Sequence, residues 1–144
     1  MDEGTKLDRL LGVWKSTYQA TNGSVGGLTI IWNPKKVDIV CLEQGCNWIS
    51  VNVQSLRSDL KFILVNTYGP NNLAGKKQVW NELSSLFWKY KEARIVIGGD
   101  FNSIISLNEK RGGLAQLSRS SLHFLNWIVD QGLIDIPIKN GTFT

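Results

Sequence analysis

Three polar residues that follow apolar segments of this sequence have side chains suited to chemistry on a phosphate group. Asp100 and Asn102 come soon after an apolar run that ends at Ile97, and Tyr68 ends another run that begins at Lys61. A carboxylate can orient a water molecule, a metal ion or a leaving group, while a phenol and an amide can donate hydrogen bonds to phosphoryl oxygens. Together the three side chains could bind a phosphodiester if the fold brings them to one place.

The same residues have a second interpretation that involves no ligand. Asp and Asn side chains in turns commonly form hydrogen bonds with the nearby backbone, and Asp100 and Asn102 directly follow Gly98-Gly99. Tyr68 precedes Gly69-Pro70, where a half-buried aromatic residue is the commoner case. The residue types leave both interpretations open for Asp100 and Asn102.

Buried strands are predicted to position these residues. The continuous apolar run over 95–97 is typical of a strand that is buried on both faces, and Gly98-Gly99 would end it because glycine allows the backbone to turn. Polar groups just past the carboxyl end of a central strand lie where open α/β sheets bind their ligands. If the strand that ends at Tyr68 lies beside this one, Tyr68, Asp100 and Asn102 share one edge of the sheet.

Apolar periodicity predicts strands in the first half of the chain and alternating helices and strands in the second. Strands are expected over residues 13–20, 28–32, 37–42, 48–53, 61–68 and 95–97. Helical spacing between Lys76 and Lys91 gives the core positions Val79, Leu83, Leu86, Phe87 and Tyr90. This order of elements indicates an α/β (α+β) fold with a mixed, mostly antiparallel sheet packed on helices or on another sheet.

A second helix is predicted after Ser118, whose hydroxyl is suited to cap a helix N-terminus. Gly132 is its expected C-terminal stop. His123 lies off the apolar stripe of this helix, so a solvated helix face suits it better than the role of catalytic base. The predicted stripe consists of Leu122, Leu125, Ile128 and Val129.

Composition indicates one ordinary globular domain of 144 residues, with 42% hydrophobic and 19% charged residues and a net charge of +4. This charge permits a polyanionic partner such as DNA without requiring one, and the pair Lys76-Lys77 is expected on a solvated face. Two cysteines and one histidine do not favour a disulfide scaffold or a zinc site. Cys41 is expected to be a buried thiol. The sequence contains neither an apolar signal segment nor a membrane-spanning run, so an intracellular protein without membrane association is expected.

Several short segments follow one another along residues 24–144 in an informative order. They are Ser24-Val25-Gly26-Gly27-Leu28, Thr67-Tyr68-Gly69-Pro70, Gly98-Gly99-Asp100-Phe101-Asn102, Glu109-Lys110-Arg111-Gly112-Gly113 and Gly141-Thr142-Phe143-Thr144. In this order they resemble the endonuclease/exonuclease/phosphatase superfamily, which includes deoxyribonuclease I-like enzymes. The resemblance is most specific to the endonuclease domain of plant-type non-LTR (LINE-type) retrotransposons.

The resemblance implies a four-layer α/β sandwich that hydrolyses phosphodiesters with a divalent metal, usually Mg²⁺, and acts on DNA, with the nucleus as its site of action. By position, Tyr68 would contact the scissile phosphate. Asp100 would position the nucleophile or protonate the leaving group. Asn102 would hold the phosphate or belong to the metal shell, and the metal ligands themselves stay undetermined beyond Asp100 and Asn102.

The sequence also departs from the family pattern. Near the start, the sequence lacks the family's strand with a catalytic Asn and a clear metal-binding Glu, and Glu3-Gly4-Thr5-Lys6 resembles the segment around that Glu only weakly. Near Thr144, it lacks the family's Ser-Asp-His segment. Residues 1–144 are therefore expected to be a single, incomplete domain, truncated at both ends and catalytically inactive. The alternatives are a non-catalytic nucleic-acid-binding module or a non-functional fragment.

Overall fold

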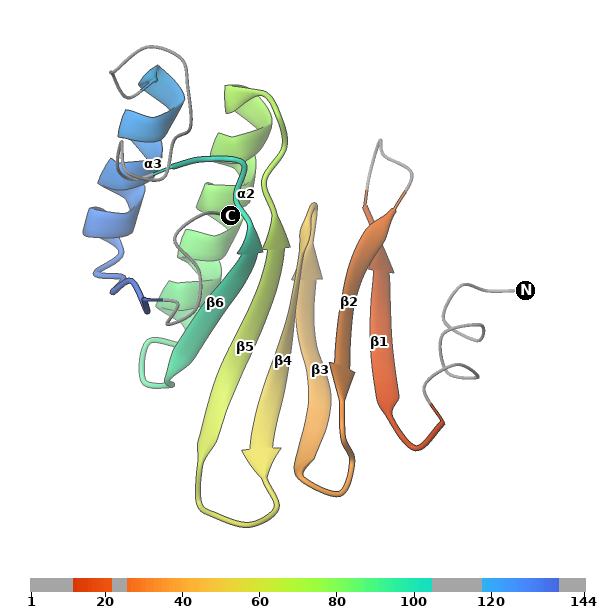
Figure 1. Ribbon diagram of the computed structural model, residues 1–144. Coiled ribbons are helices and arrows are strands. Elements are labelled where there is room, and N and C mark those ends of the chain that lie inside the picture. The colour runs from red at the N-terminus through yellow and green to blue at the C-terminus, as the bar shows by residue number, and fades with distance from the viewer. Residues whose placement is uncertain (1–11, 22–25, 105–117, 138–144) are drawn as a thin grey trace.

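The computed structural model describes residues 12–21, 26–104 and 118–137 of the chain. Within them it contains six strands and two helices (Figure 1). The elements are β1 (Lys15–Ala20), β2 (Gly27–Trp32), β3 (Val37–Gly45), β4 (Trp48–Ser55), β5 (Lys61–Tyr68), α2 (Leu73–Lys89), β6 (Ile95–Asp100) and α3 (Arg119–Asp130). The predicted segments Glu109-Lys110-Arg111-Gly112-Gly113 and Gly141-Thr142-Phe143-Thr144, and part of Ser24-Val25-Gly26-Gly27-Leu28, lie outside the described residues.

The strands form a two-stranded and a four-stranded sheet. β1 and β2 make an antiparallel hairpin, and the larger sheet has the order β3-β4-β5-β6. The β3–β4 and β4–β5 pairs are antiparallel, whereas β5 and β6 are parallel and are connected through α2. This combination confirms the predicted mixed, mostly antiparallel α/β architecture.

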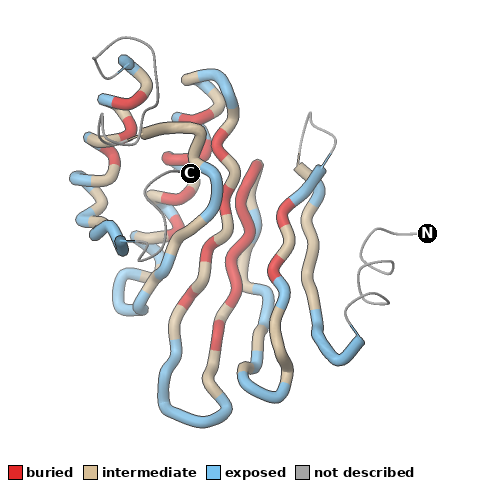
Figure 2. Tube along the Cα trace, in the orientation of Figure 1, coloured by how far each residue is buried: buried red, intermediate tan, exposed pale blue. Residues whose placement is uncertain are grey.

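Two apolar cores lie on opposite faces of the four-stranded sheet, because successive residues of a strand point to opposite sides. On one face Trp48, Ile63 and Val65 pack against α2 and α3. On the other face Val51 and its neighbours pack against the hairpin through Leu28. The described residues thus form helix, sheet and hairpin layers of an α/β sandwich, with the buried positions concentrated in β4, β5 and α2 (Figure 2).

Aromatic rings join the two helices. Trp80 of α2 stacks on Phe124 and Trp127 of α3 at centroid distances of 5.7 and 6.1 Å. The predicted core stripe of α3 is therefore wrong in part, since Leu122 is 49% and Val129 67% exposed. Phe124 and Trp127 occupy the buried face instead, because their large rings fill the space against α2. The predicted cap is confirmed, with Ser118 accepting a hydrogen bond from the backbone N–H of Ser121.

Both outer strands of the four-stranded sheet are less buried than their apolar sequences suggest. β6 was expected to be covered on both faces, but Val96 is 37% exposed. Cys41 of β3 is exposed rather than buried. Each strand has a hydrogen-bonded neighbour on only one side among the described residues, and the hairpin covers only part of the sheet. Neither helix among the described residues has the combination of length and hydrophobicity that a membrane-spanning helix requires.

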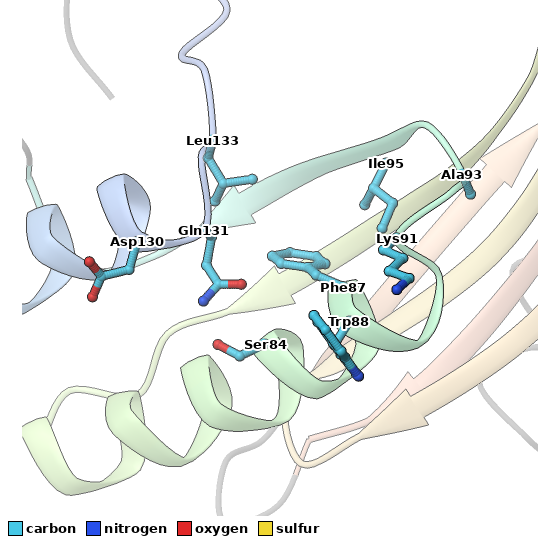
Figure 3. A pocket seen from close by; sticks show the side chains of 9 residues that line it. All are labelled: Ser84, Phe87, Trp88, Lys91, Ala93, Ile95, Asp130, Gln131 and Leu133. Carbon is cyan, nitrogen blue, oxygen red and sulfur yellow. The ribbon is translucent and has the colours of Figure 1, made fainter.

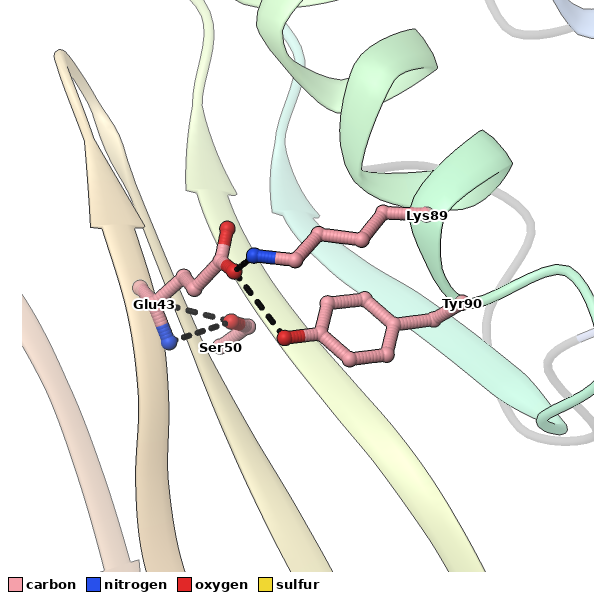
Figure 4. A network of polar contacts seen from close by, with 4 residues as sticks. All are labelled: Glu43, Ser50, Lys89 and Tyr90. Atoms are coloured by element: carbon pink, nitrogen blue, oxygen red, sulfur yellow. Dashed lines mark hydrogen bonds and ion pairs between the residues drawn. The ribbon is translucent and has the colours of Figure 1, made fainter.

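A polar network fastens β3 to the C-terminal end of α2 (Figure 4). One carboxylate oxygen of Glu43 accepts hydrogen bonds from the ammonium of Lys89 and, at 2.9 Å, from the hydroxyl of Tyr90. On the neighbouring strand β4, the Ser50 hydroxyl donates to the backbone carbonyl of Glu43 and accepts from its N–H. The hydrogen bond from Lys89 is the main cause, and that from Tyr90 the second, of a lowered pKa of the Glu43 carboxyl.

Replacing Glu43 with glutamine should make the stability of the fold less dependent on pH below neutrality. A carboxyl whose pKa is lower in the folded state stabilises the fold above its unfolded pKa, and this contribution is lost as pH falls through the folded value. We expect a lower melting temperature for Glu43→Gln than for wild type at pH 7, and a smaller difference at about pH 3, below the usual glutamate pKa. Melting curves at both pH values measure it. A difference that persists unchanged at the lower pH, or an equal effect of Asp59→Asn in an exposed turn, would contradict the assignment.

Candidate active site

The parallel pairing of β5 and β6 places two of the three predicted site residues side by side. Tyr68 is the register partner of Asp100 at the carboxyl end of both strands. Partners in a pleated sheet lie on the same face, so Tyr68 and Asp100 share the face that packs toward the β1–β2 hairpin. The prediction that the two strands are neighbours is confirmed.

Gly99 allows this pairing to continue to the end of β6. The strand includes Gly98 and Gly99, so the glycines do not end it as expected. Gly99 has φ +133°, and a Cβ at this position would lie 1.9 Å from the carbonyl oxygen of Thr67. The close backbone approach therefore requires glycine at this position, and it brings the end of β6 against the end of β5.

The segments that follow the two strands are joined directly. The N–H of Gly69 donates to the carbonyl of Asp100 at 2.6 Å, and the side-chain amide of Asn102 donates to the carbonyl of Gly69. A Cβ on Gly69 would lie 2.1 Å from the carbonyl oxygen of Phe101. The two segments after β5 and β6 thus form one tightly packed unit.

Asp100 and Asn102 also make local turn contacts. The Asp100 carboxylate accepts a hydrogen bond from the Asn102 N–H at 2.9 Å, and Asn102 has the left-handed φ of +48°. Asp100 is exposed and Asn102 is half-buried. The structure therefore contains the predicted turn in which Asp100 and Asn102 form hydrogen bonds with the nearby backbone. The same turn presents the Asp100 carboxylate at the sheet edge beside Tyr68.

Phe101 fixes this turn to the core. It lies between the two polar residues, and its ring packs against Phe124 of α3 at a centroid distance of 5.1 Å. Since Phe124 also stacks on Trp80, the position of Asp100 depends on the aromatic contacts between the helices.

Lys76 is a buried residue of the site region that the sequence analysis placed on a solvated face. Only 6% of it is exposed, and its ammonium donates to the carbonyl of Asn102 and, at 3.2 Å, to the hydroxyl of Ser120. Burial lowers the pKa of Lys76, while the charge of Asp100 acts in the opposite direction. Helical spacing offered a signal, because Lys76 lies three and four residues before the buried Val79 and Trp80.

Solved structures with a similar fold are nucleases and related catalytic domains. The endonuclease domain of TRAS1, a telomere-specific non-LTR retrotransposon, superposes with a TM-score of 0.65 at 12% identity, over 83% of this chain and 53% of that one. The catalytic domain of human Nocturnin superposes with a TM-score of 0.52 at 16% identity, over 71% of this chain and 47% of that one. The chain therefore spans about half the length of the solved structures it matches. No protein-family model and no curated protein sequence matches it.

Both of these structures belong to one superfamily. This chain has the endonuclease/exonuclease/phosphatase fold. The superfamily resemblance found in the sequence is confirmed at the level of fold.

The described part of this superfamily fold offers few ligands for a metal ion. Asp100 supplies a carboxylate and Asn102 an amide oxygen, which are ligands that Mg²⁺ accepts. Among the described residues no group of three or more His, Cys, Asp or Glu side chains could hold a metal ion. The described residues thus fit one part of a magnesium site but do not complete one.

A groove of about 490 Å³ lies elsewhere on the superfamily fold (Figure 3). Its lining includes Phe87 and Trp88 of α2, Leu133 after α3, and Ile95, the first residue of β6. Asp100 is the last residue of the same strand. The groove is therefore at the opposite end of β6 from the candidate active site.

Proposed function

We propose that this chain contains part of the active site of a phosphodiester-cleaving nuclease domain of retrotransposon type, with DNA as its substrate. The observation that supports this most is the register of β5 and β6, which pairs Tyr68 with Asp100. The fold similarity to a retrotransposon endonuclease domain supports the choice of DNA.

Each residue has a role that its contacts allow. The Tyr68 hydroxyl would donate to a phosphoryl oxygen, and the exposed Asp100 carboxylate would orient the nucleophile or protonate the leaving group. Asn102 uses one amide hydrogen on Gly69. An amide has a second hydrogen and an oxygen acceptor, which would hold the phosphate. Mg²⁺ bound partly by Asp100 would supply Lewis-acid stabilisation of the developing charge.

We further propose that the 144 residues alone do not cleave DNA. Water activation needs a general base placed at the reacting phosphate, and the only histidine of the sequence, His123, belongs to α3 rather than to the sheet edge. At the edge of the sheet where Tyr68 lies, the ligands that the described residues offer the metal are Asp100 and Asn102, and no group of three or more His, Cys, Asp or Glu side chains completes the site among those residues. The chain would therefore bind DNA without cutting it.

Nicking of supercoiled plasmid in Mg²⁺ tests the inactivity. We expect the wild-type chain and Asp100→Ala to give the same level of nicking as buffer. Nicking by wild type that disappears in Asp100→Ala would refute the proposed inactivity and support the site. Equal nicking by both proteins would indicate a contaminating nuclease.

An NMR titration with a short DNA duplex in Mg²⁺ tests the site itself. We expect the amide resonances of Tyr68, Asp100 and Asn102 to be among those that shift, with an affinity that falls as salt increases, because phosphate contacts release counterions. Shifts confined to lysine-bearing segments away from this edge would instead favour a non-catalytic nucleic-acid-binding module. An affinity that does not depend on salt would contradict both functions.

A further inference from the structure

Lys76 connects three segments that are far apart in the sequence. It lies in the first turns of α2, and its ammonium contacts the carbonyl of Asn102 after β6 and the hydroxyl of Ser120 near the start of α3. Its side chain is buried, whereas the next residue, Lys77, is exposed. A lysine at position 77 is therefore expected for a solvated helix face, whereas the presence of a lysine at the buried position 76 needs another explanation.

The surroundings of Lys76 disfavour its charge. Burial removes water from the ammonium, and this lowers the pKa of Lys76. The residue is also near the N-terminal ends of α2 and α3, whose backbone dipoles disfavour a cation there. Hydrogen bonds from the ammonium and the nearby Asp100 carboxylate offset these penalties.

The contact with Asn102 completes a set of restraints on a strained residue. Asn102 has φ +48°, a conformation that costs free energy in a residue other than glycine. Its N–H is bound to the Asp100 carboxylate, its amide to Gly69, and its carbonyl to Lys76. Without the third restraint, the partly buried carbonyl would lose this hydrogen bond.

We propose that Lys76 is a positioning residue that holds the Asp100–Asn102 turn in its left-handed form and so keeps the Asp100 carboxylate beside Tyr68. Lys76 supports the turn from the interior of the protein, because it is buried and its ammonium contacts Asn102 and Ser120. It need not contact a substrate to serve this role. The role of the turn in phosphodiester chemistry rests on the proposed function, but the restraint by Lys76 can be measured independently of it.

Amide hydrogen exchange in the intact chain tests the proposal through Lys76→Met, which keeps an apolar stem and removes the charge and the donors. We expect exchange of the Gly69 and Asn102 amides to become faster by about tenfold or more, while Val65 in the central strand keeps its rate within about twofold, as in local rather than global opening. In Lys76→Arg the exchange rate of the Asn102 amide should stay within about threefold of wild type, since guanidinium keeps the charge and the donors.

Lys77→Met is the matched control, because it removes the same charge from the exposed neighbouring position. It should leave all these exchange rates as in wild type. Equal acceleration at Val65 and Asn102 in Lys76→Met, or no acceleration at Asn102, would overturn the positioning role. If Lys76→Met does not fold, the wild-type protein decides: a scalar coupling across the hydrogen bond from ¹⁵Nζ of Lys76 to the ¹³C carbonyl of Asn102 supports the proposal, and an ammonium that averages freely like that of Lys77 refutes it.

The two hypotheses fail in different ways. If the proposed function is wrong, DNA leaves Tyr68 and Asp100 unshifted while the exchange effect of Lys76→Met remains. If the positioning role is wrong, DNA still shifts Tyr68 and Asp100 while exchange at Asn102 does not respond to Lys76→Met.

Discussion

Replacing Trp127 with alanine should lower the free energy of unfolding by about 3–5 kcal/mol, the usual range for removing a large buried aromatic side chain. Trp127 is only 8% exposed, and its ring lies 6.1 Å from those of Trp80, Phe87 and Phe124. Its indole N–H also donates to the Ser84 hydroxyl at 2.9 Å. The change therefore removes apolar contacts and a polar contact between α2 and α3. Urea denaturation followed by circular dichroism measures the effect.

Trp88→Ala provides the matched control for this prediction. Trp88 is 74% exposed at the C-terminal part of α2, so its loss should change the unfolding free energy by no more than about 0.5 kcal/mol, as for most surface substitutions. Similar losses for both variants would mean that the aromatic cluster between the helices is not the main apolar contact of α3.

Replacing Gly99 with alanine should disrupt the end of the β5–β6 pair. The φ of +133° costs an alanine on the order of 1–3 kcal/mol, and the added Cβ would meet the Thr67 carbonyl at 1.9 Å. Because that contact is with backbone, relief requires β6 to move away from β5. We expect a clear loss in thermal stability and large shifts of the Tyr68 and Asp100 amide resonances.

Gly98→Ala tests whether the effect comes from the geometry of Gly99 rather than from any added methyl group. A Cβ placed on Gly98 would have no atom within 4 Å other than those of Gly98 and its two neighbours in the chain. This variant should therefore fold with nearly wild-type stability and leave the Tyr68 resonance in place. Equal damage by both substitutions would contradict the close approach at Thr67.

Local patterns were sufficient to predict much of the fold. Apolar runs and apolar alternation identified all six strands of the described residues to within a few positions, and helical spacing identified the two helices described there. The start of α2 was placed late, at Lys76 rather than Leu73, although a signal was present: the Asn72 side chain caps the helix by accepting the Gly75 N–H at 2.7 Å. The approach of Tyr68 to Asp100 followed from the assumption that their strands are neighbours, which the register confirms.

Features that depend on tertiary packing could not be predicted in the same way. The periodicity of α3 is compatible with a face through Leu122 or with one through Phe124, and only the rings of α2 select the second. Similarly, the exposure of Cys41 depends on β3 being an outer strand of its sheet. Lys76 was misplaced because its charge outweighed its position on the apolar face of the helix.

The connection of β5 to β6 through α2 has a consequence for the order of folding. The hairpin and the β3–β4–β5 meander join strands that are close in sequence, so their pairing closes short loops. β6 can pair with β5 only after the chain between Gly69 and Arg94 has closed a much longer loop, which slows its formation. We therefore expect the turn at Asp100 to form late, so that a folding intermediate with every antiparallel pair formed would still lack the candidate active site.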